Sequence, residues 1–502
     1  MALVVMLPTL IEIIDTSIVN VSLDHIRGSL SAGINEATWA ISSYLLSNAI
    51  VIPMSGWLSR LFGRKRYQIG SIALFTIASF LCGSAWSLES LVFFRIVQGL
   101  AGGGLVPVSQ AILLEAFPRK EHGMAMALFG IGVMFGPIVG PLLGGVITDS
   151  WSWRWIFYIN IPIGALAIFL SYLFIHDPPY MKRQKMKIDY TGFAFLAVGL
   201  GSLQYVLDTG QRSDWLGSET IVGFLILSAV SLVFLAINEK YHEHPIINLS
   251  LFKDRSFASG CIVMFFVFFN LFGSIVLLPV FLQALMGYTS MHAGLVMGPG
   301  GLASLFTMPI VGRLVTRVNP KFILGTGILI ASGTTYAMSL FNLQTDFWTF
   351  VLPRVTLGIA MSCIFIPTTT LTLSHIPRER MGEATSVYNM IRNLGGSMGI
   401  AFAFTVATRR AQFHQARLVE HLTPFDPAFL AAKAKAAGLL ASRGLMLPPE
   451  APIYRELIRQ SNMLGFNDAF FVVAIILIAV MGLVLLMQRP EEGKGPGGGR
   501  VD

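Results

Sequence analysis

Apolar stretches close to the length of a bilayer span recur from one end of this 502-residue chain to the other. A helix that crosses a membrane needs about 20 predominantly apolar residues. Only 12% of the residues are charged, whereas soluble domains carry about 25%. The sequence therefore predicts an all-α polytopic membrane protein rather than two or three soluble domains.

We expect fourteen transmembrane helices. By residue range they are 1–24, 38–59, 67–86, 91–115, 121–148, 154–175, 190–208, 219–238, 256–285, 290–316, 321–342, 347–374, 381–408 and 465–487. Because the count is even, both termini lie on one side of the membrane.

The basic residues place both termini in the cytoplasm. With this orientation, the cytoplasmic loops hold 21 of the 35 Lys and Arg residues, and the short outer loops hold only Arg27 and Arg212. Positive charge favours the cytoplasmic side, although a long loop such as 409–464 is weakly constrained. Because the charges cluster between apolar runs, the net charge of +8 does not indicate a nucleic-acid partner.

The two ends of the chain carry related motifs at a nearly constant separation. An offset of 259 residues aligns Arg95 with Arg354, Gly99 with Gly358, Pro118 with Pro377, Gly123 with Gly382, Ala125 with Ala384, Gly136 with Gly395, and Gly140 with Gly399. An offset of 256 aligns Pro53 with Pro309, Gly56 with Gly312, Leu58 with Leu314, and Lys65 with Lys321. A repeat in one orientation predicts two halves related by an axis along the membrane normal.

This repeat divides the chain into four parts. They are an N-terminal six-helix half at 1–175, a linker with two inserted helices at 176–255, a C-terminal six-helix half at 256–487 that includes an outer hairpin at 409–464, and a cytoplasmic tail at 488–502. Two packed halves with a midplane cavity can alternate access by rocking.

Charged residues inside the spans cost about 2.5–3.5 kcal/mol each, so each one needs a role. Glu12 and Asp15 are three residues apart and share a helix face. Burial disfavours a charged carboxylate and a nearby arginine favours it. We therefore predict a proton-coupling site made of Asp15, Glu12 and Arg95, with a structural ion pair as the alternative. The roles of Arg354 and Arg392 stay open between site and structure.

Small residues repeat every fourth position in the span at 121–148, and helices approach closely at such stripes. Prolines within the stripe bend a helix. We expect a tight, bendable seam where the halves meet, formed by Gly132, Gly136, Pro137, Gly140 and Gly144.

The loop from Gly56 to Arg66 combines glycines with a basic cluster, so it predicts a cytoplasmic gate in which Gly56, Gly63 and Arg64 take part. A positive-inside signal alone is the simpler interpretation.

Aromatic, methionine and polar residues within the spans predict a substrate cavity. Such residues suit large apolar cations through cation–π contacts and soft packing, although many of the Phe residues are expected to face lipid. The candidates are Tyr44, Asn48, Gln110, Phe269, Asn270, Tyr388 and Asn389.

Motifs for nucleotide or metal chemistry are absent from the sequence. It contains no GxxxxGK[ST] loop, and none of the nine histidines lies deep in a predicted span. We expect neither an enzyme nor a bound cofactor, and an ion gradient as the energy source.

Five segments carry a family resemblance: Asp15-Thr-Ser-Ile-Val-Asn-Val-Ser-Leu, Gly56 to Arg66, Arg95-Ile-Val-Gln-Gly, Gly132 to Gly145, and Trp153-Arg-Trp-Ile-Phe-Tyr-Ile-Asn-Ile-Pro-Ile-Gly. Together they resemble the fourteen-helix drug:proton antiporter family of the major facilitator superfamily, of the EmrB/QacA type and most closely EmrB-type multidrug export subunits. The resemblance implies the major facilitator fold with two inserted helices. It also implies proton-driven export of hydrophobic or cationic toxic compounds across the bacterial inner membrane, with Asp15 as the proton-linked carboxylate and Arg95 as its partner.

The outer segment 409–464 is long in the manner of that family, and it is expected to be helical from Ala428 to Arg443. The resemblance implies that a periplasmic membrane-fusion protein docks there, and through it an outer-membrane channel. The candidate docking residues are Thr423, Pro424, Phe425, Asp426 and Pro427.

Two other functions stay open. One is proton-coupled export of a single dedicated metabolite. The other is a non-transporting membrane receptor or scaffold, which would move no protons and would leave Asp15 and Arg95 without a role.

Overall fold

The computed structural model is a bundle of long helices, and it describes residues 2–178, 189–242, 245–442 and 446–488. Within these ranges the chain forms helices and no strands, so the all-α prediction is confirmed. The basic cluster at 182–187 and the predicted tail after Gln488 lie outside the described residues.

The helices form two groups joined by a helical pair. The first group is α1 (Ala2–Ser29), α2 (Ile34–Ala37), α3 (Trp39–Phe62), α4 (Arg64–Gly83), α5 (Leu88–Gly102), α6 (Leu105–Ala116), α7 (His122–Ser150), α8 (Trp155–Tyr158) and α9 (Asn160–Phe174). The joining pair is α10 (Tyr190–Thr209) and α11 (Glu219–Tyr241). The second group is α12 (Arg255–Ala284), α13 (Ser290–Leu314), α14 (Pro320–Met338), α15 (Phe347–Leu373), α16 (Met381–Val419), α17 (Pro427–Ser442), α18 (Glu450–Ala479) and α19 (Met481–Val484). Short 3₁₀ turns occupy Arg119–Glu121, Trp215–Gly217, Leu249–Lys253 and Arg378–Arg380.

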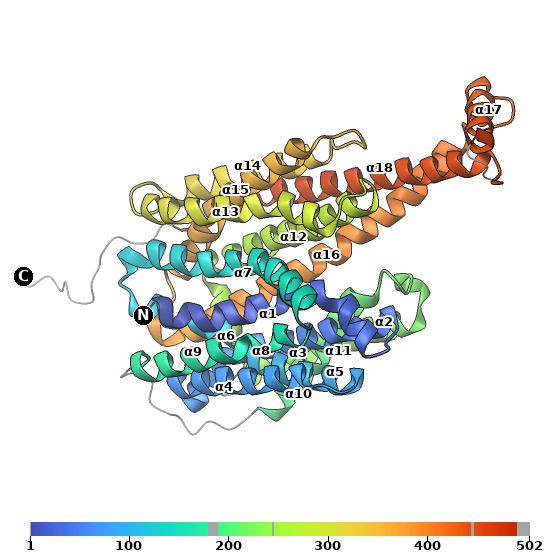
Figure 1. Ribbon diagram of the computed structural model, residues 1–502. Coiled ribbons are helices and arrows are strands. Elements are labelled where there is room, and N and C mark those ends of the chain that lie inside the picture. The colour runs from blue at the N-terminus through green and yellow to red at the C-terminus, as the bar shows by residue number, and fades with distance from the viewer. Residues whose placement is uncertain (1, 179–188, 243–244, 443–445, 489–502) are drawn as a thin grey trace, which may run out of the picture.

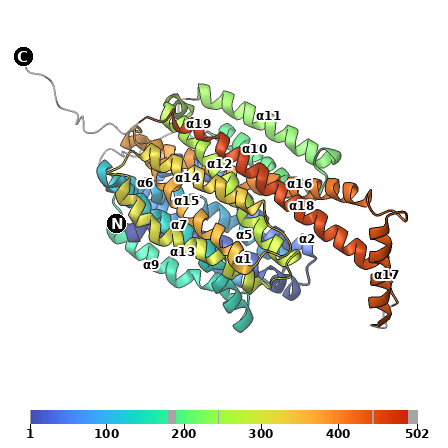
Figure 2. The same cartoon turned by 90° about the horizontal axis from the view of Figure 1, so that it is seen from above.

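The two groups lie side by side as two halves (Figure 1). In each half the first helix packs along the fifth long helix: α1 along α7, and α12 along α16. Turned by 90°, α11 lies at the outer edge of the bundle (Figure 2). We call the end where α1 begins the N-terminal end and the opposite end, from which α16 and α18 project, the hairpin end.

The outside of the bundle is apolar and its inside is partly polar, which reverses the pattern of a soluble protein. Phe234 and Ile237 of α11 are half exposed, whereas Asp15, Gln98 and Asn160 are buried. Ten helices in the described ranges are long and apolar enough to cross a membrane. The chain is therefore a multi-pass membrane protein, while the count of fourteen spans stays a prediction.

The span expected at 91–115 lies within one apolar stretch, Leu88–Ala116, that is long enough to cross a membrane. A run of three glycines ending at Gly104 interrupts its helix between α5 and α6. At the hairpin end, α16 and α18 continue well beyond the predicted limits of 408 and 465. Arg409 and Arg410 end the apolar run in α16, which is why the sequence predicted an end there. The helix itself continues, because its backbone hydrogen bonds form within the helix and do not depend on apolar surroundings.

Candidate functional site

Asp15 of α1 is completely buried at the centre of a polar cluster in the first half. Its Oδ2 accepts a hydrogen bond from Nη1 of Arg95 at 2.5 Å. Its Oδ1 accepts from Nε2 of Gln98 and from Nδ2 of Asn160, each at 2.9 Å. The carboxylate therefore has a counter-charge and two neutral donors, which is the condition under which a buried charge is stable.

Arg95 is equally well satisfied. Its Nε donates to the carbonyl of Ala40 at 2.8 Å, and Nη1 also donates to Gln98. Its guanidinium lies over the ring of Tyr44, with Cζ 4.2 Å from the ring centroid. The predicted pairing of Asp15 and Arg95 is thus present, and Tyr44 packs against this pair inside the first half instead of lining a cavity between the halves.

Sequence reasoning did not single out Gln98 and Asn160, although both bind Asp15. Gln98 stands in the Arg95-Ile-Val-Gln-Gly motif and Asn160 in the Trp153–Gly164 segment. A polar residue inside an apolar span was the available signal, but the partner of such a residue lies on another helix and cannot be read from spacing.

Glu12 lies one turn before Asp15 and has very different surroundings. It is 8% exposed, and its Oε1 accepts from Nδ2 of Asn48 at 3.0 Å. Its Oε2 is buried and has no hydrogen-bond partner. Glu12 is therefore a buried carboxylate with one oxygen that lacks a hydrogen-bond partner.

Arg392 is also incompletely satisfied. It is 9% exposed, its Nη1 has no partner, and its Cζ lies 5.1 Å from the ring centroid of Phe268. Such a cation–π contact partly compensates a desolvated guanidinium.

Two further polar contacts cross between the halves. Gln110 of α6 accepts from Nδ2 of Asn389 of α16 at 2.6 Å. Ser55 of α3 and Ser386 of α16 are hydrogen-bonded at 2.8 Å. The structure thus brings the predicted cavity residues Gln110 and Asn389 together at the contact surface of the halves.

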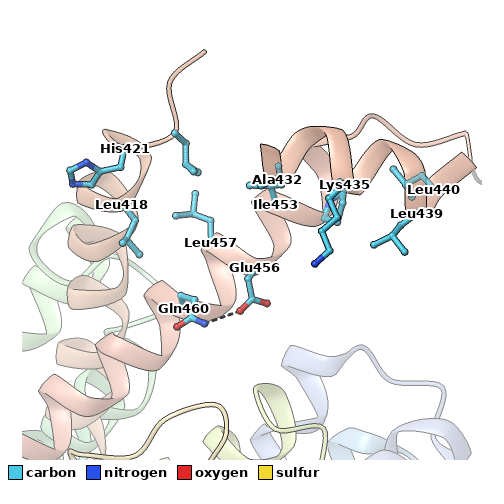
Figure 3. Close-up of a pocket in the computed structure, with 13 residues that line it drawn as sticks. Leu418, His421, Ala432, Lys435, Leu439, Leu440, Ile453, Glu456, Leu457 and Gln460 are labelled. Atoms are coloured by element: carbon cyan, nitrogen blue, oxygen red, sulfur yellow. Dashed lines mark hydrogen bonds between the residues drawn. The ribbon is translucent and has the colours of Figure 1, made fainter. Parts of the chain in front are cut away.

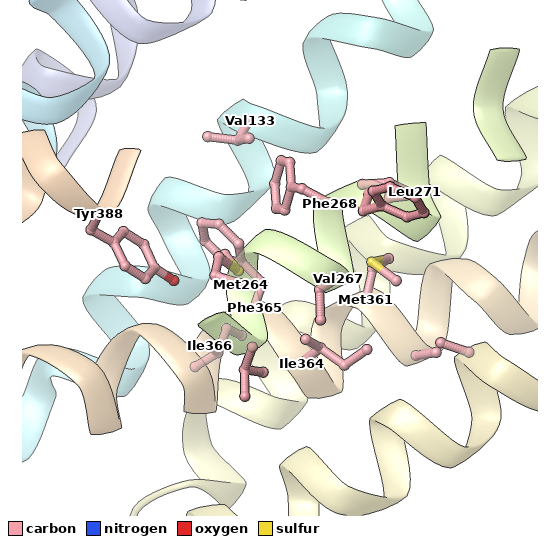
Figure 4. Close-up of a cluster of buried hydrophobic side chains, with 14 of the residues drawn as sticks. Val133, Met264, Val267, Phe268, Leu271, Met361, Ile364, Phe365, Ile366 and Tyr388 are labelled. Carbon is pink, nitrogen blue, oxygen red and sulfur yellow. The ribbon is translucent and has the colours of Figure 1, made fainter. Parts of the chain in front are cut away.

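An apolar cluster rich in aromatic and methionine side chains adjoins these contacts (Figure 4). Its side chains come from α7 of the first half and from α12, α15 and α16 of the second. The labelled members are Val133, Met264, Val267, Phe268, Leu271, Met361, Ile364, Phe365, Ile366 and Tyr388.

Three other residues predicted to line the substrate cavity are Tyr388, Phe269 and Asn270, and each contacts different neighbours. Tyr388 is completely buried and its hydroxyl is hydrogen-bonded to Thr369 at 3.0 Å. Phe269 is almost completely buried among other phenylalanines, and its ring centroid is 5.3 Å from that of Phe402. Asn270 is bonded to Thr335 of α14 at 3.1 Å inside the second half, and its role in a substrate cavity stays a prediction.

The glycine stripe of α7 lies inside the first half. A Cβ on Gly136, Gly140 or Gly144 would lie within 3 Å of Ile13, Ser17 or Ile18 of α1, respectively. Gly132 is less tightly packed, and the side chain of Pro137 is exposed. The prediction of a seam where the halves meet is therefore corrected: the close approach joins α1 and α7 of one half.

The predicted gate residues lie at the N-terminal end, and one of them joins the halves. A Cβ on Gly56 would lie 2.5 Å from the carbonyl oxygen of Gly382. Arg60, one turn further along α3, forms an ion pair with Glu383 of α16. These contacts hold the two halves together at this end.

The other two gate residues support the turn between α3 and α4. Gly63 has φ +85°, a conformation that favours glycine. Asp177 accepts a hydrogen bond from the backbone nitrogen of Lys65 at 2.9 Å, and Arg64 is buried in an ion pair with Glu115. Both residues stabilise the first half, and Arg64 also lies against the second, because its Nη2 atom would be 3.6 Å from a Cβ on Gly382 of α16.

At the hairpin end, α17 lies across the tips of α16 and α18 (Figure 1). The prediction of a helix at Ala428–Arg443 is confirmed by α17, Pro427–Ser442. The docking candidates Thr423 to Pro427 form the turn before it, and the Phe425 side chain is 93% exposed. A cavity of about 650 Å³ lies under α17 (Figure 3). Its apolar walls include Leu418, Leu439 and Leu457.

Two related helical halves and an apolar exterior define a membrane transporter. The chain belongs to the Major Facilitator Superfamily, whose family model matches residues 5–400. This confirms the predicted family and fold class.

Curated relatives are similar over nearly the whole chain. The Multidrug export protein EmrB of Escherichia coli strain K12 is 35% identical over 99% of this chain and 97% of its own length. The Fatty acid resistance protein FarB of Neisseria gonorrhoeae is 34% identical over 98% of this chain and 96% of its own. The solved human organic anion transporter MFSD10 has a TM-score of 0.63 at 12% identity, covering 96% of this chain and 98% of that one, which shows a shared fold.

Proposed function

We propose that this protein exports hydrophobic, positively charged toxic compounds across the bacterial inner membrane in exchange for protons. The relatives named for multidrug export and for fatty acid resistance support an apolar cargo. The aromatic and methionine cluster between the halves supports a large, flat and polarisable substrate, because such side chains adapt to varied shapes and attract cations.

The observation that carries the coupling mechanism is the free Oε2 of Glu12. A carboxylate that binds either a proton or a cationic substrate, and not both, makes each ligand weaken the other, and this linkage is reciprocal. Asp15 is unsuited to such exchange because Arg95, Gln98 and Asn160 already hold both of its oxygens. In this proposal Glu12 carries the proton and Asp15 fixes the helices around it.

Arg392 completes the exchange site. In this proposal Arg392, on α16 of the second half, supplies the positive charge opposite Glu12 while neither proton nor substrate is bound. When Glu12 binds a proton or a substrate cation, the ring of Phe268 still stabilises the guanidinium.

The proposal includes orientation and partners. Both termini lie in the cytoplasm, so the hairpin end faces the periplasm. There the exposed turn from Thr423 to Pro427 and the apolar cavity beneath α17 form the docking site of a membrane-fusion protein. The chain is then the pump subunit of a tripartite efflux system that continues to an outer-membrane channel.

The test is proton movement in proteoliposomes after addition of tetraphenylphosphonium, comparing the unaltered protein with Glu12→Gln and Asp15→Asn. We expect compound-induced dissipation of the pH gradient in the unaltered protein, and the level of empty liposomes for Glu12→Gln. Asp15→Asn leaves Arg95 buried without its counter-charge, which costs about 3–5 kcal/mol of stability, but its folded fraction should still exchange protons.

Each other result has a definite meaning. If Glu12→Gln exchanges protons as well as the unaltered protein and folded Asp15→Asn does not, Asp15 is the proton carrier and this assignment is wrong. If no member of a broad panel of lipophilic cations moves protons through the unaltered protein, multidrug export is wrong. A single dedicated substrate or a scaffold role then replaces it.

A further inference from the structure

Several glycines of the two halves make corresponding contacts, and this permits a comparison of the interiors of the halves at these positions. A Cβ on Gly140 would approach the carbonyl of Ile14, and one on Gly399 would approach the carbonyl of Phe269. Likewise, a Cβ on Gly99 would lie 2.5 Å from the carbonyl of Tyr44, and one on Gly358 would lie 1.9 Å from that of Gly300. The same contacts therefore recur in both halves at offsets between 255 and 259 residues.

These offsets place three residues of the second half where the first half has its buried ion pair. Arg354 takes the place of Arg95, and Asn270, the residue after Phe269, takes the place of Asp15. Thr335 on α14 takes the place of Ser79 on α4. The hydrogen bond from Asn270 to Thr335 at 3.1 Å agrees with this, since Ser79 is bonded to Asn160 beside Asp15.

The second half thus keeps the arginine and has lost the acid. Arg95 has three hydrogen bonds, one of them to the carboxylate of Asp15. Arg354 is 6% exposed, and its Nε and Nη1 have no hydrogen-bond partner within the described residues. A guanidinium cannot lose its proton under physiological conditions, and a buried charge without a partner is strongly destabilising. The charge of Arg354 therefore needs a compensating anion that the described part of the chain does not supply.

We infer that Arg354 is the anchor of an anion-binding site inside the second half, in the region equivalent to the buried Asp15–Arg95 pair. The Nε and Nη1 atoms of the planar guanidinium carry N–H groups without an acceptor, and such charged donors suit a small monovalent anion such as a halide ion or the carboxylate of an amphipathic acid. A large hydrated anion does not fit, because the surrounding helices leave little of the side chain accessible.

The first test measures the melting temperature of the purified full-length protein in matched salts. Sodium chloride, sodium bromide and sodium octanoate are each compared with sodium gluconate, which is too large and too hydrated for a buried site. If the salt is at about ten times its dissociation constant, we expect a rise of about 1–2 °C over gluconate. If only the halides raise the melting temperature, the ligand is a free ion. If only octanoate raises it, the ligand is the carboxylate of an amphipathic acid.

Two variants assign the effect to Arg354. Arg354→Gln removes the cation, so the melting temperature should no longer depend on the anion. Asn270→Asp places a carboxylate where the first half has Asp15, so it should abolish the dependence while keeping the protein at least as stable. Arg27→Gln, at an exposed position on α1, is the control and should keep the dependence.

The proposal is overturned if none of the three salts raises the melting temperature of the unaltered protein over gluconate. It is equally overturned if Arg354→Gln, once shown to be folded, retains the full anion effect. The comparison of salts needs only the unaltered protein, so the proposal can be tested even if a variant does not fold. Neither result depends on proton exchange at Glu12.

Discussion

At the scale of single residues, two carboxylates one turn apart have different environments because different helices surround them. Their shared face followed from their spacing, and the sequence correctly paired Asp15 with Arg95. The donors Gln98, Asn160 and Asn48 come from α5, α9 and α3, and only the packing of those helices decides which carboxylate is saturated. For this reason the sequence could not decide between Glu12 and Asp15.

The glycine stripe of α7 gives a prediction at the same scale. In Gly136→Ala, the new methyl group would lie 2.4 Å from the Cγ2 atom of Ile13. Since Ile13 is β-branched and has little freedom to turn away, overpacking should cost about 1–3 kcal/mol. The measurement is the melting temperature of detergent-solubilised protein.

Gly132→Ala is the matched control on the same stripe. Its methyl group would meet Met6 at 3.5 Å, an ordinary contact, so we expect no loss of stability. If both variants are equally stable, α1 and α7 are not in the close contact described.

At the scale of helices, the clearest departure from the sequence expectation is the hairpin. The apolar runs of the sequence predicted where the spans lie. They could not predict where α16 and α18 end, because charged residues end an apolar run without ending a helix. The two arms are held together where Gly465 of α18 meets the backbone of Ala407 and Ala411. Arg410 and His414 of α16 also bind the carboxylate of Asp468, at 2.5 and 2.8 Å.

This contact predicts the effect of enlarging a single glycine. In Gly465→Val, the new Cβ would lie 2.4 Å from the carbonyl oxygen of Ala407, and backbone cannot move aside as a side chain can. The arms should separate, and trypsin should cleave the hairpin, which contains Arg417, Lys433 and Lys435, several-fold faster, because cleavage follows the population of the open form. Gly438→Val, where nothing lies within 4 Å, should be cleaved like the unaltered protein; equal rates for both variants would contradict the contact.

At the scale of the whole molecule, the halves are joined at the N-terminal end by two equivalent glycine contacts. Gly56 meets Gly382, and Gly312 meets Gly123. The two contacts are equivalent, because Gly312 corresponds to Gly56 at an offset of 256 residues and Gly382 corresponds to Gly123 at an offset of 259. The repeat in the sequence therefore predicted which residues are equivalent but not that they touch, since a pairing between halves depends on how the halves dock. Charge breaks this symmetry, because Arg60 and Glu383 form an ion pair on one side and their equivalents, Thr316 and Met124, cannot.

The last prediction concerns this closed end. Gly56→Ala would place a methyl group 2.5 Å from the carbonyl oxygen of Gly382, whereas Gly382→Ala would meet its nearest neighbour, Ser59, at 3.5 Å. The two substitutions affect the same contact, but only Gly56→Ala is expected to disturb it. Because packed interfaces switch between discrete arrangements and do not deform continuously, Gly56→Ala should shift the population towards a form in which the N-terminal end is open. Spin labels on the tips of α3 and α13 should report longer distances for Gly56→Ala, and unaltered distances for Gly382→Ala. If both variants keep the distances of the unaltered protein, this glycine contact does not control the closure of the N-terminal end.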